Sequence, residues 1–462
     1  MEAIKITPAP LSGELRVPPS KSAAHRNIIC AALGSGESVI LPVCHSEDID
    51  ATIGCVKALG ALVEEKNGCF YVTGIDREAI KNQSVTLDCR ESGSTLRFML
   101  PIAAALGVNA TFIGRGRLPE RPIDALTDIL RANGVKCSNN ALPLTISGIL
   151  RPNEYKISGN VSSQYLTGLL FAIAINGGSA TLTTELQSAG YIALTVKIMS
   201  DFGVRITKKG NIYTSKGDFS PTSSVIEGDW SQACFFLSAA AMGGKISLLG
   251  LDSSSTQGDK SVIELYKSFG AEIIAEKEKI IAKGNSLNAI KINCAQIPDA
   301  VPALAVVAAM TNGTTQIVGG ERLRLKETDR IKTVIDGLVA MGVKVEELPD
   351  GMKITGGKIT GGRVNGAGDH RIVMAFAVLG AYANKETVIE GYKSENKSYP
   401  QFFEDFIYLC HSKSGIYSNP SYFLFSKGDK LCVIGFICFI FLDKVEDAYA
   451  KFRLHHQRKA RI

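Results

Sequence analysis

The sequence predicts an α/β protein made of six repeated units that form two compact halves of three units each. Helix-length apolar runs recur at intervals of 67 to 72 residues, and a short polar or glycine-containing cluster precedes each run. A step from helix to hairpin, marked by glycine, follows each of the first five runs. The polar clusters begin at Ser20, Ser92, Ser162, Asp229, Asp299 and Asp369.

The six runs are apolar on every face, which predicts helices buried on all sides. Each helix begins with backbone N–H groups that no intrahelical partner satisfies, and these groups favour anions. If the units pack symmetrically, several helix starts face one cleft. Nearby Lys and Arg side chains would then complete a pocket for polyanionic small molecules.

A second element keeps the same period. An amphipathic stretch ends in glycine followed by alternating apolar residues, which is typical of a helix stop and a strand start. These steps lie at 58–63, 132–137, 202–206, 269–273 and 341–345. The unit therefore reads strand, buried helix, strand, amphipathic helix and hairpin. Units of about 70 residues are too long for a solenoid, so we expect two halves that meet near Gly228.

Composition fits a large globular enzyme, with 462 residues of which 45% are hydrophobic. The 11 cysteines include no CxxC pair and no Cys/His spacing that suits zinc, so we expect neither a structural disulfide nor a metal site. The first ten residues lack the basic and apolar segments of a signal peptide, which favours a cytoplasmic location.

Most of the net charge of +6 lies at one end of the chain. Residues 407–462 hold nine Lys and Arg against four Asp and Glu, which leaves +1 for residues 1–406 and argues against nucleic-acid binding. The same end contains an apolar run at 431–442, which is too short to span a bilayer. We expect this run to dock on the body of the protein, and membrane contact by the tail is the disfavoured alternative.

Six motifs, spread in order over about 400 residues and placed at repeat junctions, resemble those of the EPSP synthases. No single motif would be specific, but the ordered set is. The motifs are PPSKSAAHR at 18–26, PERPI at 119–123, SSQYLTGLL at 162–170, RLKETDRI at 324–331, GDHR at 368–371 and NKSYPQFFEDF at 396–406.

The resemblance implies a two-domain, inside-out α/β barrel with threefold pseudo-symmetry in each domain. The chain would cross between the domains near Pro19 and near Gly228. The implied domains are 20–228 for the N-terminal half and 1–19 plus 229–406 for the C-terminal half. Residues 407–462 would be an atypical C-terminal extension, because family members usually end soon after the last motif.

The resemblance also implies a reaction of the shikimate pathway, which leads to chorismate and the aromatic amino acids. The enolpyruvyl group of phosphoenolpyruvate moves to the 5-hydroxyl of shikimate 3-phosphate, and phosphate leaves. Two phosphates and two carboxylates must be held together, and fixed cations supply both neutralisation and alignment. The expected partners are these two small molecules, with no cofactor, no metal and a monomeric enzyme.

Matching motif positions give the expected substrate-binding residues. For phosphoenolpyruvate they are Lys21, Arg121 and Lys397 on the phosphate and Arg330 and Arg371 on the carboxylate. For shikimate 3-phosphate they are Ser162, Ser163 and Ser188 on the phosphate, Gln164 on the ring, Ser22 nearby and Arg26 on the carboxylate. Gly93, Asp299, Lys326 and His370 complete the expected set.

The reaction needs one group to take the proton of the 5-hydroxyl and another to protonate the methylene carbon. By resemblance, Asp299 is the expected base and Glu327 the expected acid, with Lys21 assisting at the phosphate. A carboxyl group among cations ionises easily, which suits Asp299, whereas Glu327 needs a special environment to donate a proton.

Alternative interpretations exist for the same residues. Each motif alone could be a helix cap or a surface ion pair. The related transferase that acts on UDP-N-acetylglucosamine typically has Lys-Asn where this chain has Lys21-Ser22, and a cysteine before its Arg-Pro where this chain reads GRGRLPERP. A non-catalytic anion-binding relative is the third alternative. One departure from the EPSP synthases is Glu91, expected to point away from the site toward Arg90 or Arg97.

Overall fold

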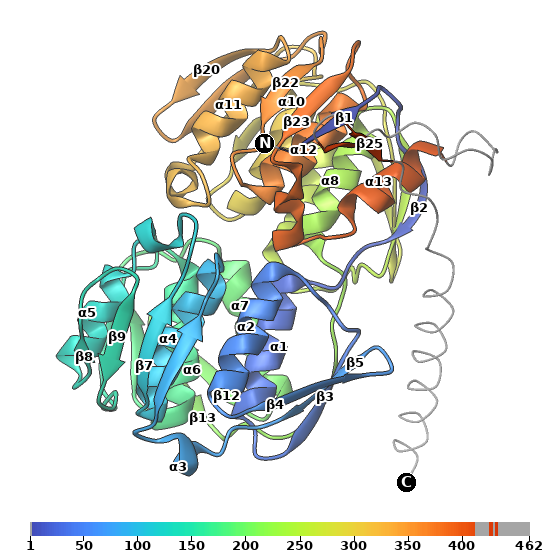
Figure 1. The fold of residues 1–462 in the computed structure, drawn as a ribbon. Helices are drawn as coiled ribbons and strands as arrows, with labels where there is room; N and C mark the ends of the chain where they lie inside the picture. The colour runs from blue at the N-terminus through green and yellow to red at the C-terminus, as the bar shows by residue number, and fades with distance from the viewer. Residues whose placement is uncertain (1, 412–424, 428–429, 433–462) are drawn as a thin grey trace.

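The computed structural model describes residues 2–411, 425–427 and 430–432 (Figure 1). Most of the apolar run at 431–442 and the whole basic end lie outside the described residues, so the prediction that they dock on the body stays a prediction. In the described part of the chain, no helix is both long and apolar enough to cross a membrane.

All six predicted buried helices are present. They are α1 (Lys21–Leu33), α4 (Gly93–Leu106), α6 (Ser163–Asn176), α8 (Trp230–Ala241), α10 (Val301–Ala308) and α12 (His370–Gly380). Five of them begin directly after the first residue of their polar cluster, whose side chain accepts a hydrogen bond from a backbone N–H of the first turn. The exception is α10, where Asp299 lies in the 3-10 turn η3 (Pro298–Ala300) and makes no capping bond.

Amphipathic helices follow the first five buried helices at the predicted places, and a further one, which the glycine steps do not predict, follows the sixth. They are α2 (Glu47–Ala58), α5 (Asp124–Ala132), α7 (Ala189–Asp201), α9 (Val262–Phe269), α11 (Arg330–Ala340) and α13 (Phe402–His411). A short helix α3 (Arg77–Ile80) and four 3-10 turns complete the helical elements of the described residues besides η3. The turns are η1 (Leu118–Glu120), η2 (Gly258–Ser261), η4 (Glu321–Leu325) and η5 (Tyr392–Lys397).

The strands of residues 20–228 form three sheets of four strands. In each sheet the first two strands are parallel, and the last two form the antiparallel hairpin. The first sheet is β14 (Ser223–Val225), β3 (Glu37–Leu41), β5 (Cys69–Thr73) and β4 (Leu62–Lys66). The second is β6 (Ser84–Asp88), β7 (Asn109–Ile113), β9 (Leu144–Ser147) and β8 (Lys136–Cys137). The third is β10 (Glu154–Ile157), β11 (Ser179–Leu182), β13 (Ile212–Lys216) and β12 (Arg205–Lys209).

The other three sheets repeat this order. The fourth is β2 (Ser12–Arg16), β15 (Lys245–Leu249), β17 (Lys279–Lys283) and β16 (Glu272–Ala275). The fifth is β18 (Lys291–Asn293), β19 (Thr314–Val318), β21 (Gly351–Thr355) and β20 (Lys344–Leu348). The sixth is β22 (Gly362–Asn365), β23 (Thr387–Glu390), β1 (Ala3–Ile6), β24 (Phe425–Lys427) and β25 (Lys430–Cys432). The repeated α/β architecture is confirmed, with the described strands in six separate sheets rather than a closed ring.

Two strands are exchanged between the units of α1 and α8. In four units the strand before the buried helix pairs in parallel with the strand after it. In contrast, β2 precedes α1 but pairs with β15, and β14 precedes α8 but pairs with β3. The two connecting segments therefore run side by side, with a bridge between Pro19 and Gly228. Ser20 N donates to Glu227 O at 2.8 Å, and Asp229 N donates to Pro18 O at 2.9 Å.

The sixth sheet draws its hairpin strands from both ends of the chain. β1 takes the third place, antiparallel to β23, and β24 takes the fourth place, antiparallel to β1. Part of the segment after residue 406 thus supplies the strand that a hairpin supplies in the other five sheets. Helix α13 also crosses residue 406 and continues to His411.

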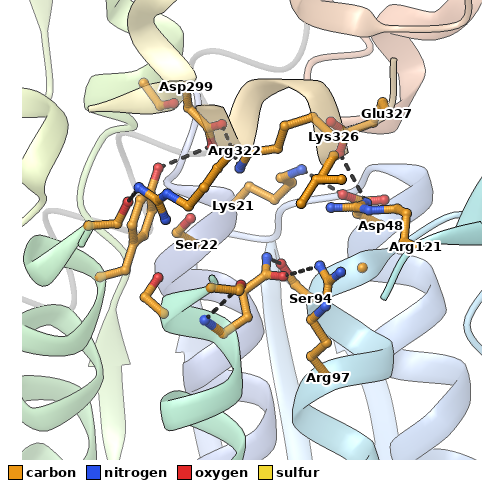
Figure 2. Close-up of a pocket in the computed structure, with 18 of the residues that line it drawn as sticks. Lys21, Ser22, Asp48, Ser94, Arg97, Arg121, Asp299, Arg322, Lys326 and Glu327 are labelled. Atoms are coloured by element: carbon orange, nitrogen blue, oxygen red, sulfur yellow. Dashed lines mark hydrogen bonds and ion pairs between the residues drawn. The ribbon is translucent and has the colours of Figure 1, made fainter. Parts of the chain in front are cut away.

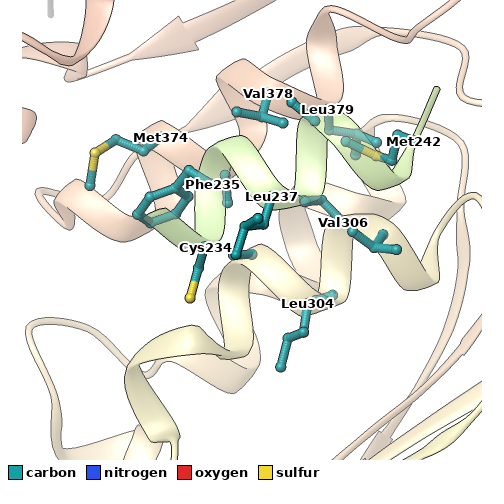
Figure 3. Packing of buried hydrophobic residues seen from close by; sticks show 14 of the residues in the cluster. Cys234, Phe235, Leu237, Met242, Leu304, Val306, Met374, Val378 and Leu379 are labelled. Atoms are coloured by element: carbon teal, nitrogen blue, oxygen red, sulfur yellow. The ribbon is translucent and has the colours of Figure 1, made fainter. Parts of the chain in front are cut away.

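Buried apolar side chains form two separate cores. One core gathers residues between 23 and 226, and the other gathers residues 4–17 with residues between 230 and 409. Figure 3 shows part of the second core, to which α8 contributes Phe235 and Leu237, α10 contributes Leu304 and α12 contributes Leu379. The helices fill the interior and the sheets lie outside them, so both cores are centred on helices.

Candidate active site

A polar pocket lies where the two cores face each other, at the starts of the buried helices (Figures 1 and 2). It encloses about 1040 Å³, including the part open to solvent. Helices α1, α4 and α6 supply side chains from one face, and η3, η4 and the starts of α11 and α12 supply side chains from the other. The symmetric packing expected from the repeats thus brings the helix starts to one cavity.

The lining is rich in cations. Eight Lys and Arg side chains stand against four Asp and Glu side chains. The cations are Lys21, Arg26, Arg97, Arg121, Arg322, Lys326, Arg330 and Arg371, and the acids are Asp48, Asp229, Asp299 and Glu327. An excess of fixed positive charge in a partly closed cavity attracts and aligns multiply charged anions.

Lys21 is held at the start of α1 by two carboxylates. Its Nζ lies 2.5 Å from Asp48 Oδ2, and its backbone N donates to Asp229 Oδ2 at 2.9 Å. Asp48 comes from α2, whereas Asp229 is the N-cap of α8 in the other core. The ammonium group is therefore aimed into the pocket from the segment where the chain passes between the cores.

Arg121 lies against Gly93 at the start of α4. A Cβ atom on Gly93 would come 2.7 Å from Arg121 Nη1 and 2.9 Å from its Cζ. The absent side chain thus makes space for the guanidinium group of Arg121. From the opposite face, Glu327 Oε1 lies 3.4 Å from Arg121 Nη1.

Arg330 is almost completely buried and contacts three carboxylates. Nε donates to Asp369 Oδ2 at 2.7 Å, Nη1 to Asp299 Oδ1 at 2.9 Å and Nη2 to Glu327 Oε2 at 2.7 Å. Asp369 caps α12 with its other oxygen, which accepts from Arg371 N at 2.9 Å. Arg330 therefore fixes the expected base and the expected acid relative to α12.

Asp299 is surrounded by cations. Its carboxylate oxygens lie 3.2 Å from Lys326 Nζ, 2.9 Å from Arg330 Nη1 and 3.3 Å from Arg371 Nη2. Burial alone would raise the pKa of Asp299, but these cations, with Arg371 the strongest, hold it well below the usual range. The side chain is therefore ionised and able to accept a proton.

Glu327 is also ionised. Burial would raise the pKa of its carboxyl group, but Arg330 and Arg121 hold the pKa well below the usual range. His370 lies at the same face, and its burial, with the charges of Lys21 and Arg371, lowers the imidazole pKa well below 6.5. His370 is neutral, and neither ring nitrogen has a hydrogen-bond partner among the described residues.

The expected shikimate 3-phosphate residues line the face formed by α1, α6 and α7. Ser162 caps α6, and Ser163 is the first residue of that helix. The other members are tied to neighbours: Gln164 accepts from Arg97 at 2.7 Å and donates to Ser94 at 2.8 Å, Ser188 accepts from Arg322 at 3.0 Å, and Arg26 donates to Ser22 O at 2.6 Å and Thr195 Oγ1 at 2.7 Å.

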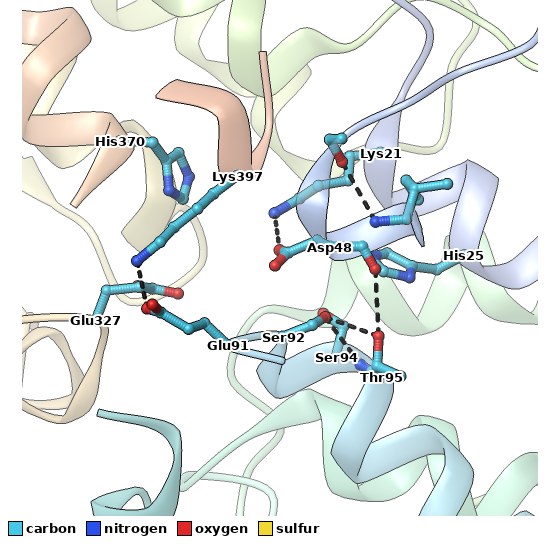
Figure 4. A network of polar contacts seen from close by, with 12 residues as sticks. Lys21, His25, Asp48, Glu91, Ser92, Ser94, Thr95, Glu327, His370 and Lys397 are labelled. Atoms are coloured by element: carbon cyan, nitrogen blue, oxygen red, sulfur yellow. Dashed lines mark hydrogen bonds and ion pairs between the residues drawn. The ribbon is translucent and has the colours of Figure 1, made fainter. Parts of the chain in front are cut away.

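Lys397 differs from the other expected residues because it does not belong to the pocket lining. Its Nζ lies 2.5 Å from Glu91 Oε2 and donates to Gly368 O at 2.8 Å (Figure 4). The expectation that Glu91 turns toward Arg90 or Arg97 is therefore wrong. Glu91 pairs with Lys397 instead, and this ion pair joins the two faces at the edge of the pocket.

All the other expected site residues lie in the pocket lining. Sequence reasoning missed several lining residues that carry charge or a hydroxyl group, namely Asp48, Arg97, Tyr191, Asp229, Ser231 and Arg322. Asp229 had been singled out only as the start of a repeat. Tyr191 follows Ser188 by one helical turn, and this spacing is the signal that could have placed it at the site.

Among the described residues, no group of three or more His, Cys, Asp or Glu side chains could hold a metal ion. The nine cysteines between residues 30 and 410 are free thiols, most of them buried.

Comparison with known proteins agrees with the fold and the pocket. The family model for EPSP synthase (3-phosphoshikimate 1-carboxyvinyltransferase) matches residues 6–406. The chain is 42% identical over 426 residues to the 3-phosphoshikimate 1-carboxyvinyltransferase of Clostridium novyi, covering 88% of this chain and 97% of the relative. The corresponding protein of Clostridioides difficile is 41% identical over 427 residues, with the same coverage.

Comparison with solved structures indicates the fold of the same enzymes. An EPSP synthase from Acinetobacter baumannii superposes with a TM-score of 0.75 at 26% identity, covering 88% of this chain and 98% of that chain. The enolpyruvyl transferase NikO from Streptomyces tendae shares the fold, with a TM-score of 0.69 at 16% identity over 88% of this chain and 97% of the other. The chain belongs to the EPSP synthase (3-phosphoshikimate 1-carboxyvinyltransferase) family.

Proposed function

We propose that the protein transfers the enolpyruvyl group of phosphoenolpyruvate to the 5-hydroxyl of shikimate 3-phosphate. The observation that carries this proposal is the pocket itself, in which eight Lys and Arg side chains line one cavity together with Asp299, an ionised carboxylate that can accept a proton. Each substrate brings one phosphate and one carboxylate. Four anionic groups therefore meet a lining with four more positive than negative side chains.

The two substrates occupy neighbouring parts of the pocket. Shikimate 3-phosphate occupies the side of Ser162, Ser163 and Ser188, with Arg26 on its carboxylate. Phosphoenolpyruvate occupies the side of Arg121 and Arg371, where backbone N–H groups at the start of α12 add to the positive potential. Lys21 lies between these two parts of the pocket and contacts the phosphate group of phosphoenolpyruvate.

The chemistry begins with proton removal. Asp299 takes the proton of the 5-hydroxyl as its oxygen bonds to C2 of phosphoenolpyruvate, and Glu327 delivers a proton to C3, which gives a tetrahedral intermediate. Glu327, ionised again after its donation, takes a proton back from C3 as the bond from C2 to the phosphate oxygen breaks, which restores the double bond, and the proton held by Asp299 leaves with the phosphate. Lys21 stabilises the leaving phosphate, and the neutral His370 offers a hydrogen bond to the intermediate.

Glu327 acquires its proton because substrate binding changes its partners. Its two oxygens contact Arg121 and Arg330. The carboxylate and phosphate of phosphoenolpyruvate compete for the same guanidinium groups, and each contact that Glu327 loses raises its pKa. The substrate thus converts an ionised glutamate into a proton donor at the site where one is needed.

We also infer that residues 20–228 and residues 1–19 plus 229–406 act as two domains that close on shikimate 3-phosphate. The two cores and the paired connecting segments support this division, with residues 407–462 as an extension. The hinge is the pair of segments around Pro19 and Gly228. Small-angle scattering should show compaction with shikimate 3-phosphate, and an unchanged radius of gyration at saturation would contradict closure.

We further infer a monomeric, cytoplasmic enzyme. The pocket of a single chain contains fifteen of the sixteen expected site residues, and Lys397 lies at its edge, which supports a site that is complete within one subunit. The free cysteines of the described residues are typical of a reducing compartment.

The test is phosphate release from phosphoenolpyruvate with either shikimate 3-phosphate or UDP-N-acetylglucosamine as acceptor. We expect release only with shikimate 3-phosphate, and a loss of about a hundredfold or more in Asp299→Ala, because that change removes the base. Retained binding of shikimate 3-phosphate by Asp299→Ala would show that the variant is folded. Release with the other acceptor, or with neither, would overturn the proposal.

A further inference from the structure

Tyr191 places its hydroxyl group between two buried carboxylates. The hydroxyl oxygen lies 3.0 Å from Asp259 Oδ2 and 3.2 Å from Asp299 Oδ2. Tyr191 belongs to the first turn of α7, Asp299 to η3 and Asp259 to η2. A continuous chain of polar groups therefore leads from the proposed base to a carboxyl group outside the pocket lining.

This chain requires a proton that one tyrosine cannot supply. A phenol has one hydrogen to donate, whereas two ionised carboxylates can only accept. Burial and the two carboxylates raise the Tyr191 pKa well above 10, so the hydroxyl keeps its proton. Both hydrogen bonds form together only when one carboxyl group is protonated and donates to the tyrosine oxygen.

Asp259 is the group that can hold this proton. Its side chain is 3% exposed, and its Oδ1 has no partner among the described residues. Asp299, in contrast, contacts Lys326, Arg330 and Arg371. Burial and then the charge of Asp299 raise the pKa of Asp259 to about 6. The other charged or titratable groups facing Asp259 are Arg371 of α12 and, from α8, Asp229 and Cys234.

The surroundings of Asp259 fix its position. Two residues before it, Gln257 accepts from Ser20 Oγ at 3.0 Å and from Trp230 N at 3.2 Å, and donates to Gly228 O at 2.8 Å. Next to it, Gly258 packs on Gly190, where an added Cβ would come 2.4 Å from Gly258 Cα. The turn η2 is thus tied both to the crossing segments and to the start of α7, which carries Tyr191.

We propose that Asp259 is a positioning residue of the reaction, and that through the Tyr191 hydroxyl it sets how strongly Asp299 accepts the substrate proton. With Asp259 protonated, Tyr191 donates to Asp299 and weakens it as a base. With Asp259 ionised, Tyr191 turns its proton to Asp259, and Asp299 becomes the stronger base. This inference rests on the proposed function for its kinetic consequence, but not for the polar chain.

Asp259→Asn tests the proposal because an amide keeps the shape and removes the titration. Above pH 6 the variant should have a kcat lower than the unchanged protein by about three- to tenfold, following the weaker base. Below that pH the two should converge, because Asp259 is then neutral in both. The matched control is Glu264→Gln, an exposed carboxylate of α9 paired with Lys267, which should leave kcat unchanged at every pH.

Tyr191→Phe separates the hydroxyl route from a direct effect of charge. In that background, Asp259→Asn should lose most of its effect on kcat at pH 8. A ratio of unchanged to Asp259→Asn kcat that stays constant with pH would overturn the proposal, and so would an undiminished effect of Asp259→Asn in Tyr191→Phe. If Asp259→Asn fails to fold, Tyr191→Phe alone tests the proposal. The plot of kcat against pH should show an inflection near the Asp259 pKa in the unchanged protein and no such inflection in Tyr191→Phe.

An infrared difference spectrum between the unchanged protein and Asp259→Asn tests the polar chain without any activity. A protonated carboxyl band should be present at low pH and should disappear as the pH rises through about 6. Absence of this band at all pH values would overturn the assignment of the proton to Asp259. Failure of the phosphate-release assay with an intact band would count against the proposed function alone.

Discussion

At the scale of single residues, the charged side chains of the pocket are held in place by their neighbours. Some neighbours leave space for a charged group, and others neutralise its charge. Gly93 leaves space for the guanidinium group of Arg121. Arg330 is buried only because three carboxylates surround it. Each substrate-facing group is thus held by a neighbour, and a change at the neighbour should act through the group it holds.

Gly93→Ala should raise the KM for phosphoenolpyruvate by about tenfold, equivalent to 1.4 kcal/mol, because the added methyl group displaces the Arg121 guanidinium. The KM for shikimate 3-phosphate should change little, since its serines lie on α6 and α7. Steady-state kinetics with each substrate varied in turn measure both. Gly54→Ala on α2, where an added Cβ meets nothing within 4 Å, is the matched control. Equal rises in both KM values would contradict this mechanism.

At the scale of elements, one device recurs at five helix starts and is set aside at the sixth. Ser or Asp caps α1, α4, α6, α8 and α12, whereas Asp299 makes no capping bond and turns to Lys326, Arg330 and Arg371 instead. The cap of α12 has a second task, because Asp369 also pairs with buried Arg330. Capping and the proposed catalysis thus use the same kind of residue at equivalent positions of the repeat.

Asp369→Ala should destabilise the protein by about 3–5 kcal/mol, because it leaves the buried Arg330 guanidinium without its only fully buried carboxylate partner among the described residues. Asp329→Ala is the control, since Asp329 caps α11 in the same way but pairs with the more exposed Arg324. Loss of that cap should cost about 1 kcal/mol. Urea unfolding of both variants measures the difference, and equal losses would show that the Arg330 pair adds nothing to the cap.

The same elements show what the sequence could predict. The buried helices, the hairpins and the gathering of fifteen of the sixteen expected site residues in one pocket could be predicted from apolar runs, glycine steps and the resemblance, because those signals are local or shared with a family. The partner of Glu91 could not be predicted, since Lys397 lies in η5 and only the packing of the two faces brings them together. The role proposed for Asp259 could not be predicted for the same reason, because it depends on a contact with Tyr191 that only the packing creates.

At the scale of the whole molecule, ion pairs cross the pocket between residues far apart in the chain. Glu91 with Lys397 and Arg121 with Glu327 join the two cores, and Arg322 donates to Ser188 beside them. Arg121 and Lys397, two of the three residues predicted to bind the phosphate of phosphoenolpyruvate, are therefore partnered by carboxylates from the opposite face. We therefore expect phosphoenolpyruvate to compete with Glu327 and Glu91 for the two cations that join the faces.

Glu91→Gln should lower the KM for phosphoenolpyruvate by about fivefold, since it removes a negative charge from Lys397, and a partly exposed ion pair is worth about 1 kcal/mol. The gain should disappear in a Lys397→Met background. Kinetics of the two single variants and the double variant form the cycle that measures this coupling. A rise in the KM of Glu91→Gln would indicate that the pair favours substrate binding by holding the faces closed.

The exchanged strands also bear on the order in which the chain is made. β2 has no partner until β15, at residues 245–249, has been synthesised, and β1 waits for β23 at residues 387–390. At about 5–20 residues per second, the first strands remain unpaired on the ribosome for on the order of tens of seconds. A nascent chain stalled before residue 245 should accordingly expose residues 3–16 to protease while the core between residues 23 and 226 resists it. The amino terminus, although it is the first part of the protein to be translated, is among the last to join a sheet.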